Sequence, residues 1–361
     1  MKIGILTYHR SHNYGALLQA IALKKVLNDM GHEATFIDYW PIYHRHLYAK
    51  INFAYLKDLG YRGKYRYIKD CLKNYSYRCQ RIANFNSFIS EYIEPYVSRM
   101  NETYDVIIHG SDQIWRKQPE WKKYNPIYFG KHNIKTKRKI SYAASMGQIS
   151  SNEEDKETLR EYLSCLSSIS VRETDLKEFV ETLGFVCYQH IDPTVLLTGE
   201  EWKKTIGIKP ENEGKYVLYY HLLPDSFDYD QIESFAREKG LGLKVIYSEA
   251  MRKNTVEQIT TGDPLVFLHL IYNAAFVFTS SFHGLVFSLL FQKPFYAAFA
   301  YNSGRAKSLL DMLGLSDRLL DPCSYVPNDD HEIDFCKVNS VLNDLRKKAI
   351  DYLYCSTIQN F

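Results

Sequence analysis

The strongest chemical signal in the sequence is a histidine that stands where an apolar strand gives way to an apolar helix. The segment between the two consists of Ser280, Ser281, Phe282, His283 and Gly284. Either serine can cap the helix, and the first N–H groups of a helix have no intrahelical partner, so they can bind a phosphate or carboxylate. A histidine there can also move a proton near neutral pH. A capped helix with a packed histidine is the alternative, but the carboxyl end of a strand favours a functional role.

An arginine follows a second predicted strand in the same way. The apolar run over residues 169–171 ends at Arg172, and Glu173 comes next. A guanidinium presents a fork of N–H donors that matches a carboxylate or a phosphate. The commoner role of an arginine is an ion pair, here with Glu173 or another acid. The sequence leaves both roles open, and Arg172 joins His283 as a candidate for binding an anion.

A further cluster has the composition of a sugar-binding surface. Asp112, Gln113 and Trp115 come just after a predicted strand over residues 106–108. They combine hydrogen-bonding side chains, which suit sugar hydroxyls, with an aromatic face. Taken alone, a turn followed by a helix cap explains the same residues equally well.

The first predicted helix opens with Asn13, Tyr14 and Gly15, which form a candidate second contact for an anion or a sugar. The opening is not a G-x-G-x-x-G loop. Asp38 at the end of the following strand therefore gives only weak support to a dinucleotide site.

Several function classes are excluded by what the sequence lacks. It contains no G-x-x-x-x-G-K-[ST], H-E-x-x-H or G-x-S-x-G motif, and no metal-ligand spacing, so no metal is expected. Its seven cysteines include no C-x-x-C pair. A net charge of +3 argues against nucleic acid as a partner. No apolar run reaches the roughly 18 residues of a membrane span, and no secretory leader is recognisable, so we expect a cytoplasmic location.

The predicted strands and helices that position these residues indicate two α/β domains. With 361 residues and about 150 per domain, two domains are the prior expectation. Strands and helices alternate along both halves, which predicts two Rossmann-like, doubly wound parallel sheets facing a cleft. The predicted limits are 1–200 for the N-terminal domain and 201–335 for the C-terminal domain. A helix within 336–361 is expected to pack back on the N-terminal domain.

One segment has a much higher net charge than the chain as a whole. Residues 43–82 hold ten Lys and Arg against two Asp, a local charge of +8, which leaves −5 for the rest of the chain. The same window contains eight of the 30 tyrosines. A basic insertion over about 43–85 that is rich in amphipathic rings suits an anionic interface such as a bilayer surface or a lipid-linked diphosphate. A solvated helical insertion with half-buried tyrosines is an equally good interpretation.

Taken together and in order, the motifs resemble those of the polysaccharide pyruvyltransferases, a family with a two-domain GT-B-like fold. The matching segments are 13–19 (NYGALLQ) with Ala22 and Leu23, 110–115 (GSDQIW), 141–147 (SYAASMG), 170–173 (SVRE), 192–194 (DPT), 279–284 (TSSFHG), and Arg305 followed by Leu309, Leu310, Gly314 and Leu315. They cover nearly the whole chain, and their joint order is the specific feature. The basic insertion matches nothing in the pattern.

The resemblance implies transfer of pyruvyl from phosphoenolpyruvate to two hydroxyls of one sugar, which forms a cyclic ketal and releases phosphate. His283 is then the expected acid/base, and Arg172 is expected to bind the carboxylate or phosphate as a second catalytic residue. The remaining donor-site residues are expected to be Ser280, Ser281, Phe282 and Gly284. The expected acceptor-side residues are Asn13, Tyr14, Gly15, Asp112, Gln113, Trp115 and Arg305.

The partners implied are phosphoenolpyruvate as co-substrate, without a further cofactor, and a sugar or lipid-linked oligosaccharide acceptor. The product would belong to an exopolysaccharide or a capsule, and a peripheral position at the inner face of the membrane is expected. Two alternatives stay open: a GT-B glycosyltransferase that uses a nucleotide sugar, and a non-catalytic carbohydrate-binding homologue.

Overall fold

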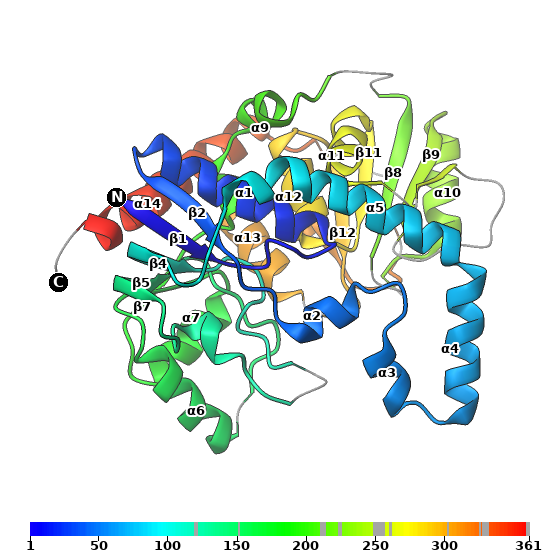
Figure 1. Ribbon diagram of the computed structural model, residues 1–361. Coiled ribbons are helices and arrows are strands. Elements are labelled where there is room, and N and C mark those ends of the chain that lie inside the picture. Colours follow the sequence, from blue (N-terminus) through cyan, green and yellow to red (C-terminus); the bar gives the residue numbers. More distant parts are fainter. Residues whose placement is uncertain are drawn as a thin grey trace.

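The computed structural model shows two parallel sheets, each covered by helices, and a helical extension on one side (Figure 1). The described residues are 1–118, 122–150, 152–209, 214–222, 226–247, 257–259, 262–301, 303–324, 326 and 332–358.

The N-terminal sheet has five parallel strands in the order β3-β2-β1-β4-β5. Its strands are β1 (Lys2–Leu6), β2 (Glu33–Ile37), β3 (Val97–Ser98), β4 (Thr103–His109) and β5 (Lys135–Ser141). A parallel pair, β6 (Ile169–Val171) and β7 (Cys187–Gln189), lies beside β5, because isolated parallel bridges join Ile140 to Ser168 and Ala144 to Val171. This pair brings the end of β6 to the edge where β1 and β4 end.

The C-terminal sheet has six parallel strands in the order β10-β9-β8-β11-β12-β13. Its strands are β8 (Tyr216–His221), β9 (Gly242–Tyr247), β10 (Glu257–Ile259), β11 (Phe276–Thr279), β12 (Phe295–Ala298) and β13 (Leu319–Leu320). In both sheets the third strand of the sheet lies outermost, followed by the second, first, fourth and fifth. This is the Rossmann order, with its switch point between the first and fourth strands. The predicted fold class is confirmed.

The helices cover both sheets and connect them. They are α1 (Tyr14–Asp29), α2 (Ile42–Leu47), α3 (Phe53–Asp58), α4 (Tyr61–Lys73), α5 (Tyr75–Tyr92), α6 (Glu153–Leu163), α7 (Thr174–Thr182), α8 (Pro193–Leu196), α9 (Gly199–Ile206), α10 (Tyr229–Glu238), α11 (Pro264–Asn273), α12 (Phe282–Leu290), α13 (Gly304–Leu313) and α14 (Phe335–Ile358). Single 3-10 turns span Glu94–Tyr96, Pro126–Phe129 and Ser316–Arg318.

The two sheets share one hydrophobic core. The cluster runs from β1 and α1 to α11 and α12, so apolar burial couples the two halves of the chain. Tyr14 at the start of α1 stacks on Phe267 of α11 with ring centroids 4.8 Å apart. Trp202 of α9 meets Phe287 of α12 edge-on at 5.2 Å. The carboxyl ends of the central strands therefore face each other across a fixed junction.

The basic segment near residue 43 forms helices α2 to α5. In Figure 1, α3 and α4 project from the body of the molecule, while α5 runs back along it. Asn52 caps α3 by accepting a hydrogen bond from the Tyr55 N–H at 3.0 Å. The Tyr67 hydroxyl accepts the Asn52 N–H at 2.9 Å, which ties α3 to α4.

The last helix, α14, lies against the N-terminal half of the chain. The Tyr352 hydroxyl donates to the Ser141 carbonyl at 2.9 Å and accepts from the Ser168 hydroxyl at 2.9 Å. Arg138 of β5 donates to the Ser356 carbonyl at 2.8 Å. The domain limits of 1–200, 201–335 and 336–361 stay a prediction.

Candidate functional site

Two helix N-termini, one from each half of the chain, meet at the candidate site. Asn13 caps α1, where its side-chain oxygen accepts the Ala16 N–H at 3.2 Å, and Ser281 caps α12, where its hydroxyl accepts the Gly284 N–H at 3.4 Å. The predicted capping role thus belongs to Ser281. Both ends leave N–H groups pointing toward the space between the sheets, which favours an anion there.

The strand-to-helix turn before α12 is tightly packed, which fixes His283. The Thr279 hydroxyl accepts the Ser281 N–H at 3.0 Å, and a Cβ on Gly284 would come 2.1 Å from that hydroxyl oxygen. Only glycine fits at position 284. The other serine, Ser280, accepts the Leu222 N–H at 2.8 Å and joins this turn to the end of β8.

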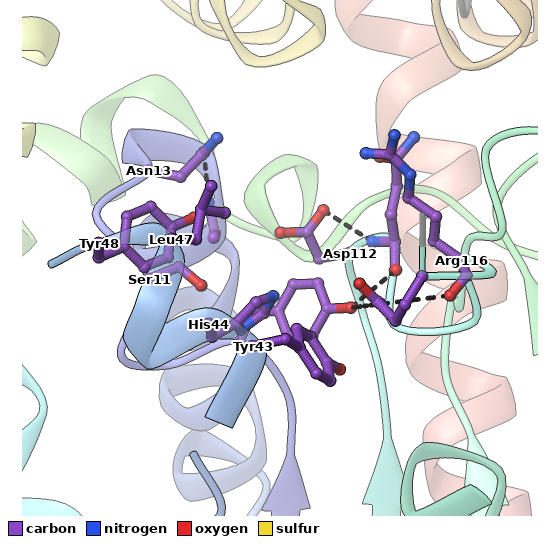
Figure 2. Close-up of a pocket in the computed structure, with 12 residues that line it drawn as sticks. Ser11, Asn13, Tyr43, His44, Leu47, Tyr48, Asp112 and Arg116 are labelled. Atoms are coloured by element: carbon purple, nitrogen blue, oxygen red, sulfur yellow. Dashed lines mark hydrogen bonds between the residues drawn. The ribbon is translucent and has the colours of Figure 1, made fainter. Parts of the chain in front are cut away.

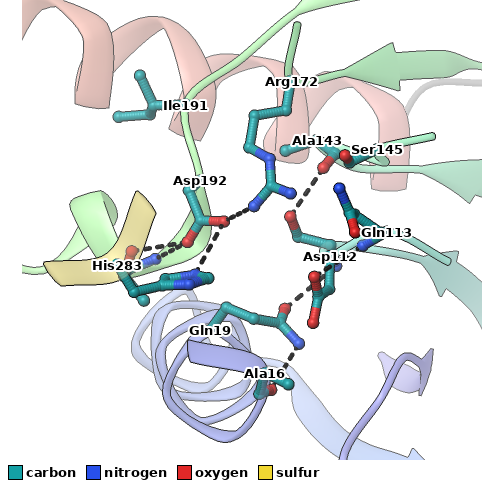
Figure 3. Close-up of polar contacts among 12 residues, drawn as sticks. Ala16, Gln19, Asp112, Gln113, Ala143, Ser145, Arg172, Ile191, Asp192 and His283 are labelled. Carbon is teal, nitrogen blue, oxygen red and sulfur yellow. Dashed lines mark hydrogen bonds and ion pairs between the residues drawn. The ribbon is translucent and has the colours of Figure 1, made fainter. Parts of the chain in front are cut away.

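Arg172, Asp192 and His283 form a buried polar chain (Figure 3). Nη1 of Arg172 donates to Oδ2 of Asp192, and Nε2 of His283 lies 3.6 Å from the same oxygen. Oδ1 of Asp192 accepts the Thr194 N–H at 2.9 Å and its hydroxyl at 2.6 Å. Burial alone would raise the pKa of Asp192, but the Arg172 guanidinium and His283 outweigh it and hold that pKa well below its usual range. Asp192 is therefore a fixed anion.

Two nitrogens of the Arg172 guanidinium have no hydrogen-bond partner among the described residues. The side chain is 3% exposed, and the two buried nitrogens are Nε and Nη2. Nε lies 3.8 Å from Oε1 of Glu173, which is ion-pair range only. A buried donor without a partner is costly, so the N–H groups of these two nitrogens are suited to an anionic ligand.

A second arginine lies near the first, across the ring of Phe282. The guanidinium carbons of Arg172 and Arg305 stand 5.0 Å and 5.3 Å from the centre of that ring. Burial, reinforced by the charge of Arg172, lowers the pKa of Arg305 to about 10. Two cations that repel each other beside one ring are an arrangement suited to an anion of more than one charge.

A carboxyl group completes the cluster. Glu173 is buried, and its Oε1 accepts a hydrogen bond from the Ser145 hydroxyl, while Oε2 has no hydrogen-bond partner among the described residues. Burial raises the pKa of Glu173 above its ordinary value, although Arg172, Arg305 and Ser145 oppose the shift. Glu173 is therefore a candidate for proton transfer next to the arginine pair.

The family model for polysaccharide pyruvyl transferases matches residues 13–303 of the chain. The chain belongs to that family. The match includes every residue of the cluster from Asn13 to His283, and it ends two positions before Arg305. No sequence among the curated proteins matches the chain.

Solved structures resemble this pyruvyl transferase family member at low identity. An E. coli heptosyltransferase WaaC with ADP is 11% identical, with a TM-score of 0.40 over 96% of this chain and 100% of that chain. A UDP-GlcNAc 2-epimerase from Methanocaldococcus jannaschii in complex with UDP-GlcNAc and UDP is 12% identical, with a TM-score of 0.46 over 96% of this chain and 93% of that one.

Connected cavities open around the candidate site, and two of them lie between the two halves of the chain. One of about 270 Å³ is lined by Ser281, His283 and Arg305 together with Asn13 and Asp112. One of about 360 Å³ lies between α2 and the end of β4 (Figure 2). A third of about 610 Å³ includes Glu173 and Arg305. Gln113 and Arg116 line all three, so they form one cleft.

Asp112 and Gln113 lie where the sequence predicts, at the carboxyl end of β4. Oδ1 of Asp112 accepts the Gln113 N–H at 2.7 Å, and Asp112 has a φ of 71°, a left-handed conformation that aspartate tolerates better than most residues. Gln19 of α1 fixes the preceding residue, because its Oε1 accepts the Ser111 N–H at 3.2 Å. Both side chains reach the cleft.

Two expected acceptor residues do not face the cleft. Trp115 is fully buried, stacks on Phe129 at 4.9 Å and donates its indole N–H to the Tyr128 carbonyl, so it offers no face to a sugar. Tyr14 is buried between the halves of the chain and donates its hydroxyl to the Gly262 carbonyl at 2.8 Å. Both stabilise the fold around the site.

Asp192, Glu173 and Arg116 also lie in the site. The sequence suggests Glu173 as an ion-pair partner of Arg172, whereas nothing in it reveals that Asp192 contacts the same guanidinium. Arg116 is exposed, its guanidinium has no hydrogen-bond or ion-pair partner in the described parts of the chain, and it lines the whole cleft. Its place follows from the turn after β4 rather than from any motif.

The described residues contain no group of three or more His, Cys, Asp or Glu that could hold a metal ion. Among the described helices, none combines the length and apolar character needed to cross a membrane.

Proposed function

We propose that this protein transfers pyruvyl from phosphoenolpyruvate to two hydroxyls of one sugar, in a polysaccharide repeat unit or its lipid-linked precursor. The products are a cyclic ketal and phosphate. The observation that carries the proposal is the pair Arg172 and Arg305 beside Phe282, together with Nε and Nη2 of Arg172, which are buried and have no hydrogen-bond partner among the described residues. Phosphoenolpyruvate is the only co-substrate in the proposal, and no cofactor is included.

Phosphoenolpyruvate carries a carboxylate and a phosphate on one carbon, C2, so it needs two adjacent anion sites. In the proposed mode, the free fork of Arg172 binds one group and Arg305, with the N-terminus of α12, binds the other. This moves Arg305 from the expected acceptor side to the donor side. Binding would relieve the repulsion between the two guanidiniums.

The reaction requires one carbon protonation and two additions at C2. A proton adds to the methylene carbon while the first sugar hydroxyl bonds to C2 and gives up its proton. The bond from C2 to the phosphate oxygen then breaks, and phosphate leaves with its electron pair. The second hydroxyl bonds to C2, and its proton passes to the site or to the phosphate.

Two groups in the site can carry these protons. His283 is the proposed acid/base, and the Asp192 carboxylate oxygen lies 3.6 Å from its Nε2. Glu173 is the second proposed proton carrier, because burial raises its pKa and Oε2 has no hydrogen-bond partner among the described residues. One group can donate to carbon while the other accepts from a hydroxyl.

The acceptor sugar is assigned to the side of the cleft lined by Asn13, Asp112 and Gln113. Asp112 lines both the cavity of His283 and the cavity beside α2, so a hydroxyl bound to it would lie between donor and acceptor. Arg116 is a further candidate contact for an anionic sugar or a diphosphate-linked one. A cytoplasmic location, on the side where phosphoenolpyruvate is made available by metabolism, belongs to this proposal.

The test is a measurement of phosphate release from phosphoenolpyruvate with free and lipid-linked galactosides and mannosides, with mass spectrometry for the pyruvyl addition. His283→Ala should lower turnover by about 10² to 10⁴-fold, the range for general acid–base catalysis. Circular dichroism and the Tm of the variant serve as controls for the fold.

A thermal-shift comparison identifies the donor independently of the acceptor. Phosphoenolpyruvate should raise the Tm of the wild type, because a ligand that binds only the native state stabilises it. A shift with UDP-sugars and none with phosphoenolpyruvate would contradict the proposal and favour glycosyl transfer. Normal turnover by His283→Ala would remove that residue from the reaction.

A further inference from the structure

Helix α4 presents an apolar face to solvent that the rest of the chain leaves uncovered. Tyr61 is 89% exposed, Tyr65 67%, and Leu72 68%. Burying such side chains is ordinarily favourable, and isolated exposed ones are common, so the informative feature is their arrangement on one helix.

These side chains form a continuous stripe. At 100° per residue, Tyr61, Tyr65, Ile68 and Leu72 fall within an arc of about 60°. The contacts with the protein are made from another side of the helix, about 90° to 130° from the middle of the stripe: Cys71 is buried, and Tyr67 accepts the Asn52 N–H. The stripe therefore points away from the molecule, as the projecting position of α4 in Figure 1 also indicates.

Cations without partners flank the stripe. Arg62, Lys69 and Lys73 lie on one side of it and Lys64 on the other, and none of their side chains makes a hydrogen bond or ion pair within the described chain. The acid of this helix, Asp70, is already paired with Arg78 of α5 at 3.1 Å. The exposed face thus combines apolar side chains with unneutralised positive charge.

The tyrosines of the segment divide into two groups. Tyr43 is buried and Tyr67 partly buried, as the interpretation of a solvated insertion predicts, whereas Tyr61 and Tyr65 stand exposed in the stripe. The partly buried ones hold the extension together. Tyr61 and Tyr65 make no side-chain hydrogen bond or ring contact with the described residues, whereas Tyr55, which is 47% exposed, packs edge-on against Tyr67.

The extension is continuous with the cleft. Leu47 and Tyr48, at the end of α2, line the cavity that holds Asp112 and also a cavity of about 440 Å³ bounded by Asp70 and Arg81. A molecule anchored near α4 can therefore reach the sugar-binding side of the cleft along α2.

We propose that α4 docks in the plane of an anionic lipid surface, with Tyr61, Tyr65, Ile68 and Leu72 in the headgroup region and the flanking cations on lipid phosphates. An amphipathic helix with cations beside its apolar face binds in this way, by apolar burial and electrostatic attraction together. The inference does not depend on the reaction, because it concerns a surface outside the proposed site.

The test is sedimentation of the full chain with vesicles of phosphatidylcholine containing phosphatidylglycerol, and with vesicles of phosphatidylcholine alone. Binding should require the anionic lipid and should weaken as salt shortens the range of charge interactions. Arg62→Gln with Lys69→Gln should weaken binding about fivefold per charge removed. Tyr65→Gln with Leu72→Gln should abolish it.

Control variants outside α4 test whether vesicle binding depends on this face or only on the overall charge and hydropathy of the protein. Lys347→Gln with Lys348→Gln removes two exposed cations of α14, and Val186→Ser removes a side chain that is 74% exposed. Both should bind vesicles as the wild type does. Phosphate release with a water-soluble acceptor should be unchanged in the α4 variants.

Three outcomes would overturn the inference. The first is an absence of vesicle binding by the wild type at low salt, and the second is equal loss of binding in the α14 and α4 variants. The third is a wild-type dimer, measured by light scattering, that Tyr65→Gln with Leu72→Gln converts to a monomer. That result would assign the face to a second copy of the chain.

Discussion

The backbone of Gly15 lies directly against the imidazole of His283: a Cβ at position 15 would stand 1.8 Å from Nδ1 and 2.2 Å from Cε1. Gly15 belongs to the first turn of α1 and His283 to the first turn of α12, so the contact joins the two halves of the chain at the site. The ring fits in this position because residue 15, on the opposite helix, has no side chain.

Gly15→Ala should therefore displace the ring. Alanine favours a helix over glycine by up to about 1 kcal/mol, but its methyl group cannot fit beside Nδ1. We expect turnover to fall by about 10²-fold, a loss typical of a misplaced catalytic group, with the secondary structure retained. Gly60→Ala is the matched control, because nothing lies within 4 Å of a Cβ there. Wild-type turnover in Gly15→Ala would show that the ring tolerates the shift.

Arg305→Gln should separate stability from donor binding. Removing one of two adjacent cations relieves their repulsion, so the Tm of the ligand-free protein should stay equal or rise. The same change should eliminate the Tm increase caused by phosphoenolpyruvate and raise its KM at least tenfold. Thermal unfolding with and without phosphoenolpyruvate measures both effects. A variant that keeps the ligand-induced shift would contradict the donor role of Arg305.

Asp192→Asn should destabilise the fold strongly. The amide oxygen can still accept from Thr194, but the amide N–H₂ would then face Nη1 of Arg172, donor against donor. Breaking a buried ion pair costs about 3–5 kcal/mol. The depressed pKa of Asp192 means that its contribution is present above the unfolded value of about 3.8 and lost only in acid, so urea unfolding at pH 7 measures it fully.

The control for that variant is Asp29→Asn, which removes the exposed Lys25–Asp29 pair of α1. Exposed pairs of this kind contribute about 0.3–0.5 kcal/mol. Equal effects of the two substitutions would mean that Asp192 contributes no more than a surface charge.

Glu173→Gln tests the second proton carrier. The amide keeps a hydrogen-bond acceptor for Ser145 but cannot transfer a proton, so kcat should fall by about 10² to 10³-fold with little change in KM. If protonated Glu173 is the acid, wild-type activity declines as pH rises through its pKa. Ser145→Ala removes a hydrogen bond that lowers this pKa and should move the decline to higher pH. An unchanged pH profile in Ser145→Ala would contradict the assignment.

Stability should fall as pH decreases from about 6.5 to about 4. Burial lowers the pKa of His9, His12 and His44 from 6.5 to about 4 each, so within this window the unfolded chain binds protons that the folded chain excludes. The free energy of unfolding then rises with pH, with a slope set by that proton difference. Urea unfolding at several pH values measures it. His44→Gln should reduce the slope by about one proton.

The sequence predicts much of the fold because the relevant signals are local. β6 has the bounds expected from its apolar run, and α12 begins beside Ser281 because capping and apolar spacing are both visible within a few residues. The position of His283 follows from the same turn. Strand order and the shared core cannot be predicted from local patterns, because they depend on residues far apart in the chain.

Only those site residues could be predicted whose position follows from a local pattern, such as the turn between a strand and a helix. Trp115 follows a strand just as Asp112 does, yet it packs against Phe129, and nothing within its own segment reveals that burial. The placement of Asp192 between Arg172 and His283 joins three separate segments. Sequence patterns identify the arginine and the histidine but not the carboxylate that pairs them.

The contacts of α14 affect the order in which the molecule can be assembled. Tyr352 and Ser356 complete the surface next to β5 and β6, but synthesis delivers them only after both sheets have been made. Domains generally fold as units during synthesis, the N-terminal one first. Here the N-terminal half leaves the ribosome with one flank uncovered, and its last packing partner arrives some 150 residues later. The two halves must therefore reach their final state together.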